Sequence, residues 1–214
     1  MSESQIIPSA PPPVGVSVED AAWVRVPTRL NPAEVAPLLR DTEVLLRLNP
    51  YYHFRELRET GTNSFHAAFE NQSNNQQLEV DVSVESGPAD GMTLRYHSGI
   101  KRRTIVSIEP FERGSYVVLT DDYAGLSETE RKEREAEVDK SLVAWGEAVR
   151  VYLLRIRRYS WIPGWRWYIR RVWIGMKPNQ RRIVWLLYLI TIVEFFFFLF
   201  VILMLNVVQL ERAL

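Results

Sequence analysis

The chain has 214 residues and no cysteine, which excludes disulfides, thiolate catalysis and thiolate metal sites. Its 26 basic and 26 acidic residues cancel, but this balance hides a basic cluster towards the C-terminus. The three histidines, His53, His66 and His97, do not have the spacing of metal ligands, so we predict neither a metal site nor a cofactor. The length suits one domain with a membrane anchor.

The first twenty residues contain four prolines and several serines, without a helical or strand period. We predict that residues 1–20 form a disordered tail. No apolar run precedes the first arginine, Arg25, so no signal peptide is expected.

A short strand at 23–29 and two short helices open the predicted domain. The first helix is expected at 33–40, where Asn31 precedes a proline in the first turn. The second is expected at 41–48, with Asp41 as its cap and an Asn-Pro pair as its end.

Extended segments with short polar or glycine-rich turns follow. Alternation is clearest where Leu78, Val80, Val82 and Val84 are separated by polar residues, which predicts a half-buried strand. The spacing predicts an antiparallel meander of six strands at 51–59, 64–70, 77–84, 92–97, 102–109 and 115–121.

Residues 127–159 predict one long helix, because Ser127 and Glu130 fit a capping box. An apolar stripe follows at helical spacing: Val138, Leu142, Trp145, Val149, Tyr152 and Ile156. A coiled coil would give a similar stripe. A sheet with one apolar face needs a cover, however, and this is the only long helix available for it.

This order of elements resembles the START-like (SRPBCC) superfamily of polyketide cyclases and birch-pollen-allergen-type proteins. The resemblance rests on the paired short helices (NPAEVAPLLR and DTEVLLRL) and on the closing helix through SLVAWGEAVRVYL. It implies an α+β helix-grip domain over residues 21–159, with a curved antiparallel sheet of about seven strands around the long helix and an apolar cavity between them. With a C-terminal membrane helix, the layout is similar to that of the membrane-tethered proteins of the carbon monoxide dehydrogenase G-subunit type.

The inward residues of this fold are candidates to line a ligand cavity, with Tyr96 and Tyr116 as its polar groups. A filled core would show the same periodicity, so both interpretations stay open. The candidates are Phe65, Phe69, Leu78, Val80, Val82, Leu94, Tyr96, Tyr116, Val118, Leu142, Trp145 and Val149.

Residues 160–179 are basic and rich in tryptophan, and five of the seven tryptophans fall between 161 and 185. Tryptophan favours the headgroup layer and arginine pairs with phosphate, so we predict an interfacial helix on anionic lipid. RNA binding is the alternative, but a membrane span five residues away argues against nucleic acid. The predicted interface residues are Trp161, Trp165, Arg166, Trp167, Arg170, Arg171, Trp173, Arg181 and Arg182.

Residues 183–205 form an apolar run of 23 residues with one charge, Glu194. At 1.5 Å per residue, such a helix spans roughly 34 Å, which is enough for a single transmembrane helix. Ten Lys/Arg and no acids lie between 150 and 182, so the positive-inside rule predicts a cytoplasmic N-terminal domain and a short extracytoplasmic tail at 206–214. Glu194 either contacts a membrane-protein partner or is simply tolerated.

These features predict a membrane-tethered cytoplasmic module that binds a hydrophobic small molecule of the lipid, isoprenoid or quinone class. An adaptor or assembly factor of a membrane complex is the alternative. A cyclase- or hydrolase-like enzyme is a third hypothesis, and it is weakened because the sequence offers no catalytic constellation.

Overall fold

The computed structural model describes residues 20–125, 138–176 and 178–213, and at 178, 179, 181 and 206–213 only the backbone is described. It forms two compact units, Met1–Arg170 and Arg171–Leu214, which are described separately. The predicted disordered tail lies outside the described residues, except for Asp20.

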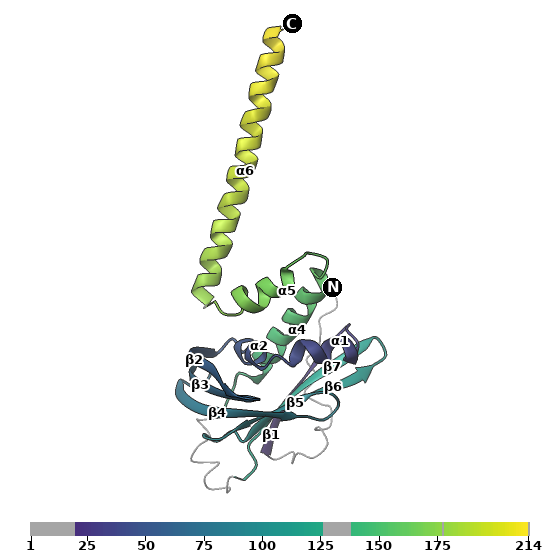
Figure 1. Cartoon of the computed structure of the whole chain (residues 1–214), viewed down its shortest axis with the longest axis vertical. Coiled ribbons are helices and arrows are strands. Elements are labelled where there is room, and N and C mark those ends of the chain that lie inside the picture. Colours follow the sequence, from purple (N-terminus) through teal and green to yellow (C-terminus); the bar gives the residue numbers. More distant parts are fainter. Residues whose placement is uncertain (1–19, 126–137, 177, 214) are drawn as a thin grey trace. The chain divides into compact units, whose positions relative to one another are not determined.

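The described part of the first unit is organised by one curved antiparallel sheet (Figure 1). Its strand order is β1-β7-β6-β5-β4-β3-β2, so the last strand in sequence lies beside the first. This order confirms the predicted meander, with β1 added to its far edge. The strands are β1 (Ala21–Thr28), β2 (Tyr52–Gly61), β3 (Ser64–Asn71), β4 (Gln76–Ser86), β5 (Met92–Tyr96), β6 (Arg103–Phe111) and β7 (Gly114–Asp122).

The two short predicted helices are α1 (Pro32–Leu39) and α2 (Thr42–Arg47). Their starts follow from local capping: Asn31 N–H donates to the Glu34 carboxylate at 2.9 Å, and Asp41 accepts from Val44 N–H at 3.1 Å. The helix α1 packs near β6 and α2 near β2.

The long helix α4 (Leu142–Arg158) packs against β1 and β7. A Cβ at Gly146 would lie 2.9 Å from the methyl groups of Val24 and Val26, so only glycine allows this close approach. The register pairs these valines with Leu119 and Val117, and paired residues share a face. These four side chains therefore form the sheet face that the helix covers.

The prediction that this helix runs from Ser127 is wrong at residues 138–141. Residues 138–141 are not helical, and 126–137 lie outside the described residues. The Asp139 carboxylate accepts a hydrogen bond from Ser141 N–H at 2.9 Å, and such side chain to backbone bonds compete with helix formation. The helix begins one residue after this local turn.

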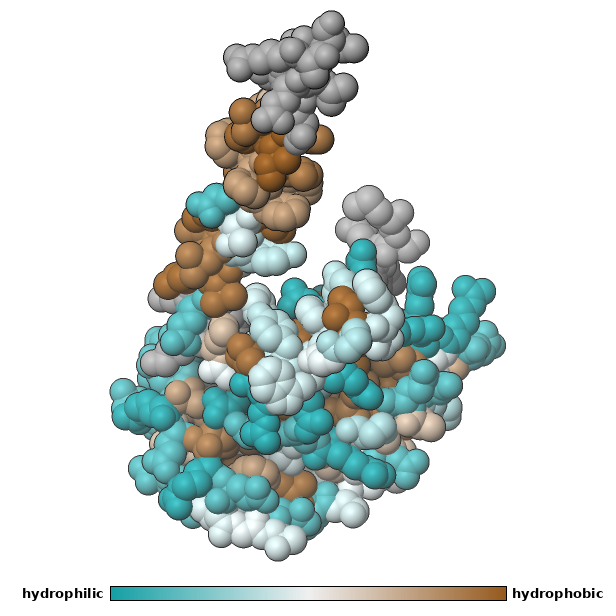
Figure 2. Space-filling view, turned by 45° about the horizontal axis from the view of Figure 1, so that its top comes forward, coloured by the Kyte–Doolittle hydropathy of each residue, from teal (hydrophilic) through white to brown (hydrophobic). Residues whose placement is uncertain are grey.

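The second unit contains α6 (Pro178–Ala213), which includes the predicted span. Within it, Arg182–Leu205 is a 24-residue stretch that is long and apolar enough to cross a membrane, and none of its most apolar window is buried. Figure 2 shows hydrophobic side chains along most of this helix. The preceding segment is less regular than predicted: α5 (Trp165–Tyr168) is one turn, and a π-helix follows at Ile169–Trp173.

Candidate functional site

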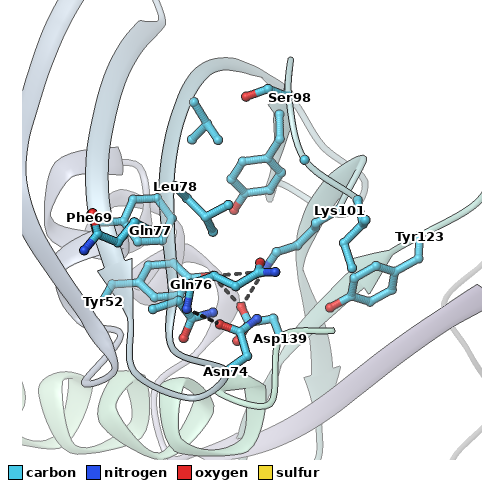
Figure 3. Close-up of a pocket in the computed structure, with 15 residues that line it drawn as sticks. Tyr52, Phe69, Asn74, Gln76, Gln77, Leu78, Ser98, Lys101, Tyr123 and Asp139 are labelled. Carbon is cyan, nitrogen blue, oxygen red and sulfur yellow. Dashed lines mark hydrogen bonds and ion pairs between the residues drawn. The ribbon is translucent and has the colours of Figure 1, made fainter. Parts of the chain in front are cut away.

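A cavity of about 260 Å³ opens at one end of the helix-grip interior (Figure 3). Its walls come from the start of β2, from β3, β4 and the turn between them, from the end of β5 and the β5–β6 loop, from the residue after β7 and from the residues before α4. Apolar side chains line it at Phe69, Leu78, Val80 and Ile100. The rest of the lining is Tyr52, Asn71, Asn74, Gln76, Gln77, Tyr96, Ser98, Gly99, Lys101, Tyr123 and Asp139.

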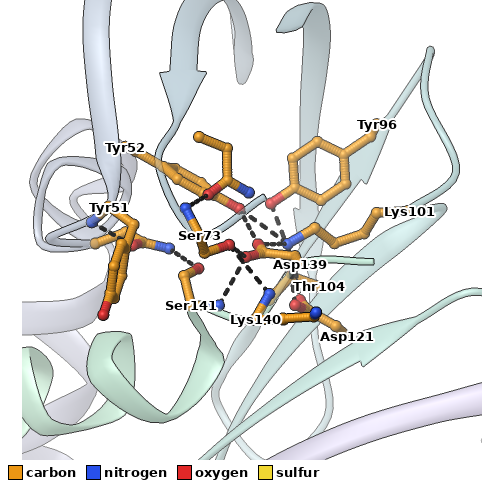
Figure 4. A network of polar contacts seen from close by, with 12 residues as sticks. Tyr51, Tyr52, Ser73, Tyr96, Lys101, Thr104, Asp121, Asp139, Lys140 and Ser141 are labelled. Carbon is orange, nitrogen blue, oxygen red and sulfur yellow. Dashed lines mark hydrogen bonds and ion pairs between the residues drawn. The ribbon is translucent and has the colours of Figure 1, made fainter. Parts of the chain in front are cut away.

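Lys101 stands at the polar end of this cavity, where the chain passes from β5 to β6 (Figure 4). Its Nζ donates to Asp139 Oδ2 at 2.7 Å, to Asp121 Oδ2 at 2.9 Å and to the Tyr52 hydroxyl at 3.0 Å. An ammonium has three N–H donors, so all three are used within the protein.

The two carboxylates are held unequally. Asp139 also accepts from the Tyr52 hydroxyl, from Ser73 Oγ at 3.1 Å and from Ser141 N–H. Asp121 lies on β7 and accepts from Lys101 and from the Thr104 hydroxyl. The Tyr96 hydroxyl lies 3.2 Å from Thr104 Oγ1 and extends the network across the sheet.

This difference in donors explains why the two carboxyl pKa values shift in opposite directions. Burial on its own would raise the pKa of Asp139, but Lys101 and the hydrogen bonds to the carboxylate hold it well below its usual range. Burial raises the pKa of Asp121, whose side chain is only 1% exposed, and Lys101 opposes this shift only in part.

The remaining titratable groups of the cluster stay protonated. Burial would lower the pKa of Lys101, but the surrounding charges, that of Asp121 foremost, raise it well above the usual lysine value. Burial raises the pKa of Tyr96 to about 12 and also raises that of Tyr52. A protonated, fully bonded Lys101 is not a nucleophile, so this arrangement is suited to forming a fixed polar wall.

Tyr123 follows β7 and is a different kind of polar group. Its side chain is buried, with 9% of the residue exposed, and its hydroxyl has no hydrogen-bond partner in the described part of the chain. The hydroxyl lies near the Asp139 backbone without the geometry of a hydrogen bond. Figure 3 shows it on the side of the tyrosine that faces Lys101 and Asp139.

Four of the predicted cavity residues line this cavity: Phe69, Leu78, Val80 and Tyr96. The register places Phe65, Val82 and Leu94 on the same sheet face, outside the cavity lining. The three helix residues, Leu142, Trp145 and Val149, are buried in the core, and the Trp145 indole donates to the Leu45 carbonyl at 2.9 Å.

The prediction that Tyr116 and Val118 face the helix is wrong. They alternate with Val117 and Leu119, which share the face covered by α4, so they lie on the opposite face. The Tyr116 ring contacts Phe111 and Arg25 there.

Sequence reasoning missed most of the polar cluster: Tyr52, Lys101, Thr104, Asp121, Tyr123 and Asp139. For Asp121 a signal existed, because it continues the alternation of Val117 and Leu119. Lys101 and Asp139 lie 38 residues apart in two segments without regular structure, and no local pattern brings them together. No group of three His, Asp or Glu that could hold a metal occurs among the described residues.

The predicted membrane-facing residues remain predictions. Trp161 and Trp167 are exposed, which suits an interface, whereas Arg170 forms an ion pair with Asp41 in the first unit. Glu194 lies on α6 among exposed apolar side chains.

Neither a protein-family model nor a curated protein sequence matches the chain. Several solved structures match the chain. A norcoclaurine synthase from Thalictrum flavum has a TM-score of 0.50 at 10% identity, over 64% of this chain and 94% of that one. A START superfamily protein from Mycobacterium smegmatis has a TM-score of 0.45 at 14% identity, over 62% of this chain and 97% of that one. A STAR-related lipid transfer protein fragment from Xanthomonas axonopodis has a TM-score of 0.37 at 14% identity, over 63% of this chain and 84% of that one.

The described domain therefore has the START-like helix-grip fold, as the sequence predicted: a seven-stranded antiparallel sheet around a long helix, followed by one helix that is apolar enough for a membrane span. At 10% identity, the similarity to the norcoclaurine synthase establishes the fold alone.

Proposed function

We propose that this protein is a membrane-tethered binding module for a hydrophobic small molecule of the lipid, isoprenoid or quinone class. The observation that carries the proposal is the cavity of about 260 Å³, in which apolar side chains lie beside the buried polar cluster around Lys101. Pockets of this character are the usual form of small-molecule sites. The similar norcoclaurine synthase was solved in complex with a transition state analogue, so a small molecule can be held by a protein of this fold.

A tether places this cavity beside the phase in which such ligands dissolve. The apolar stretch of α6 and the ten basic residues before it support a single span with the domain on the cytoplasmic side. Because the chain has no cysteine, single cysteines at Ser4 and Ala213 give a direct test. Labelling of both from one side would contradict a single span.

The binding role is tested by mass spectrometry of small molecules that co-purify with the full chain in polymer nanodiscs. We expect a stoichiometric lipophile in wild type. It should be lost in Val80→Trp, which fills the cavity, or in Leu78→Trp if the buried Val80 site does not accept the larger ring. Glu79→Trp, on the exposed opposite face, is the control. An empty cavity in folded wild type would contradict the proposal.

The basic segment before α6 is proposed to lie on anionic lipid. A chain that ends near Pro178 should bind vesicles containing phosphatidylglycerol and release them as salt screens the arginine charges. Pure phosphatidylcholine vesicles are the control. Equal binding to both kinds of vesicle would contradict an electrostatic contact.

An adaptor role in a membrane complex is the second candidate, and Glu194 is the observation that favours it. A carboxyl group near the middle of a span costs on the order of 2–3 kcal/mol on the lenient insertion scale, and a partner that hydrogen-bonds it would offset this cost.

A further inference from the structure

We propose that the cavity selects lipophiles whose polar end is an uncharged hydroxyl or carbonyl group, and that the Tyr123 hydroxyl is the hydrogen-bond partner of that end. The inference rests on the proposed binding function and makes its ligand class narrower.

Lys101, the cationic side chain of the cavity lining, has no donor left for a ligand. Its contacts to Asp139, Asp121 and Tyr52 use all three N–H bonds at 2.7 to 3.0 Å. An anionic headgroup would have to displace one of these bonds and leave a buried carboxylate or the Tyr52 hydroxyl without its donor, which is costly in a site shielded from water.

The charge at the polar end also disfavours an anionic ligand. This end holds two carboxylates, Asp121 and Asp139, and one ammonium. An incoming carboxylate, phosphate or sulfonate would therefore meet more negative than positive charge. Because the surroundings are largely buried, this repulsion is poorly screened by water.

Tyr123 offers a ligand the hydrogen-bonding group that the cluster does not. Its side chain lines the cavity, and its hydroxyl is buried and has no partner among the described residues. A hydroxyl both donates and accepts, so it can serve a ligand carbonyl or a ligand hydroxyl. The further polar lining near the exposed rim is also uncharged: Gln76, Gln77 and Ser98.

The test uses the full chain in phosphatidylcholine nanodiscs and two photoreactive probes. One is decanol with a diazirine on its chain, and the other is the matched decanesulfonate, which stays ionised. Crosslinks to peptides that contain Leu78 and Ile100 report the cavity, and crosslinks to α6 correct for how much probe enters the lipid. We expect the alcohol to label the cavity at least about tenfold more than the sulfonate, since burying an unpaired anion is strongly unfavourable.

The variant Tyr123→Phe tests whether the Tyr123 hydroxyl is the hydrogen-bond partner of the ligand. It removes a hydroxyl without a partner in the described part of the chain and should leave folding intact, while cavity labelling by the alcohol falls roughly three- to tenfold, the value of one hydrogen bond. Tyr116→Phe, on the opposite sheet face, is the matched control and should change nothing. The wild-type comparison of the two probes holds even if Tyr123→Phe does not fold.

Equal labelling by both probes, stronger labelling by the sulfonate, or unchanged labelling in folded Tyr123→Phe would overturn the inference and leave the binding function standing. Cavity peptides that neither probe labels would overturn the proposed function, and this inference with it.

Discussion

The two units of this chain hold carboxyl groups in opposite ways. In the helix-grip domain, Asp121 and Asp139 are buried, and every hydrogen bond they accept comes from the same chain. In α6, Glu194 lies among exposed apolar side chains, and the described part of the chain shows no ion pair or hydrogen bond to it.

The difference shows where each unit is complete. A buried charge is tolerated when it is paired and hydrogen-bonded, and the domain meets that condition without a partner. On α6, within the proposed span, the described part of the chain offers Glu194 no such bond, so a second chain is its proposed partner. The domain should therefore be sensitive to changes within it, and α6 to changes in its surroundings.

The largest effect is expected at the centre of the cluster. Lys101→Met leaves Asp121 and Asp139 buried without their counter-charge, and removing one member of a buried ion pair typically costs about 3–5 kcal/mol. The free energy of unfolding, measured by denaturant titration of the full chain in detergent, should fall by that amount.

Lys140→Met is the matched control, because Lys140 is exposed and contacts the cluster only through its backbone. It should change the free energy of unfolding by less than about 0.5 kcal/mol. A loss in Lys101→Met no larger than in this control would mean that the domain does not depend on the cluster's charge balance.

A second effect concerns acid. The pKa of Asp139 is held below its unfolded value of about 3.9, so the stability it contributes is present above that pH and is lost as the pH falls further. The raised pKa of Asp121 has the opposite effect on the free energy of unfolding, because this carboxyl group favours the folded state more as the pH falls. In Asp139→Asn the free energy of unfolding should therefore depend less steeply on pH below about 4 than in wild type. An unchanged slope would show that Asp139 is not held ionised in the folded state.

On the alkaline side, the raised pKa of Lys101 means that its contribution is present below the ordinary lysine value of about 10.4 and is lost above it. Tyr52 and Tyr96, also raised, add to the same loss. The cluster therefore stabilises the domain between its acid and alkaline limits, and neutral pH lies well inside this range.

The order of elements could be predicted because the signals for them are local. Alternation marks the strands, and the caps at Asn31 and Asp41 mark the short helices. Prediction fails where a tertiary contact decides the local structure: the helical pattern includes Asp139, whereas its bonds to Lys101 and Ser141 hold it in a turn.

The cavity is only partly predictable for the same reason. The alternation on β4 correctly places Leu78 and Val80 facing inward, but on β7 the predicted inward set is one residue out of phase. Every residue from Ser115 to Asp122 is buried apart from Tyr116, so hydrophobicity alone does not distinguish the two faces of that strand. A register error of one residue exchanges the faces, which is why Tyr116 and Val118 are predicted to face inward in place of Val117, Leu119 and Asp121.

The smallest effect is expected at Glu194, and it is the one that tests whether α6 has a partner. Glu194 is the twelfth of the 23 residues of the predicted span, so each interface is some 17 Å away at 1.5 Å per residue, too far for its short side chain to reach. The predicted span has no glycine, alanine or serine, so close self-packing is disfavoured and a different partner chain is the better candidate.

An interhelical hydrogen bond of this kind is worth roughly 0.6–2 kcal/mol in a membrane, enough to decide whether a partner survives extraction. Glu194→Gln keeps a group that donates and accepts, so membrane association and any complex should persist. Glu194→Leu should insert at least as well as wild type, because it removes a polar group from the apolar core, but should lose the partner in mild detergent. The measurement is quantitative co-purification from membranes, with Thr191→Val as a control for an unrelated polar change, since the Thr191 hydroxyl bonds the Leu187 carbonyl within the helix. Identical partners in wild type and Glu194→Leu would show that Glu194 is merely tolerated, and the carboxyl group of α6 would then need no second chain.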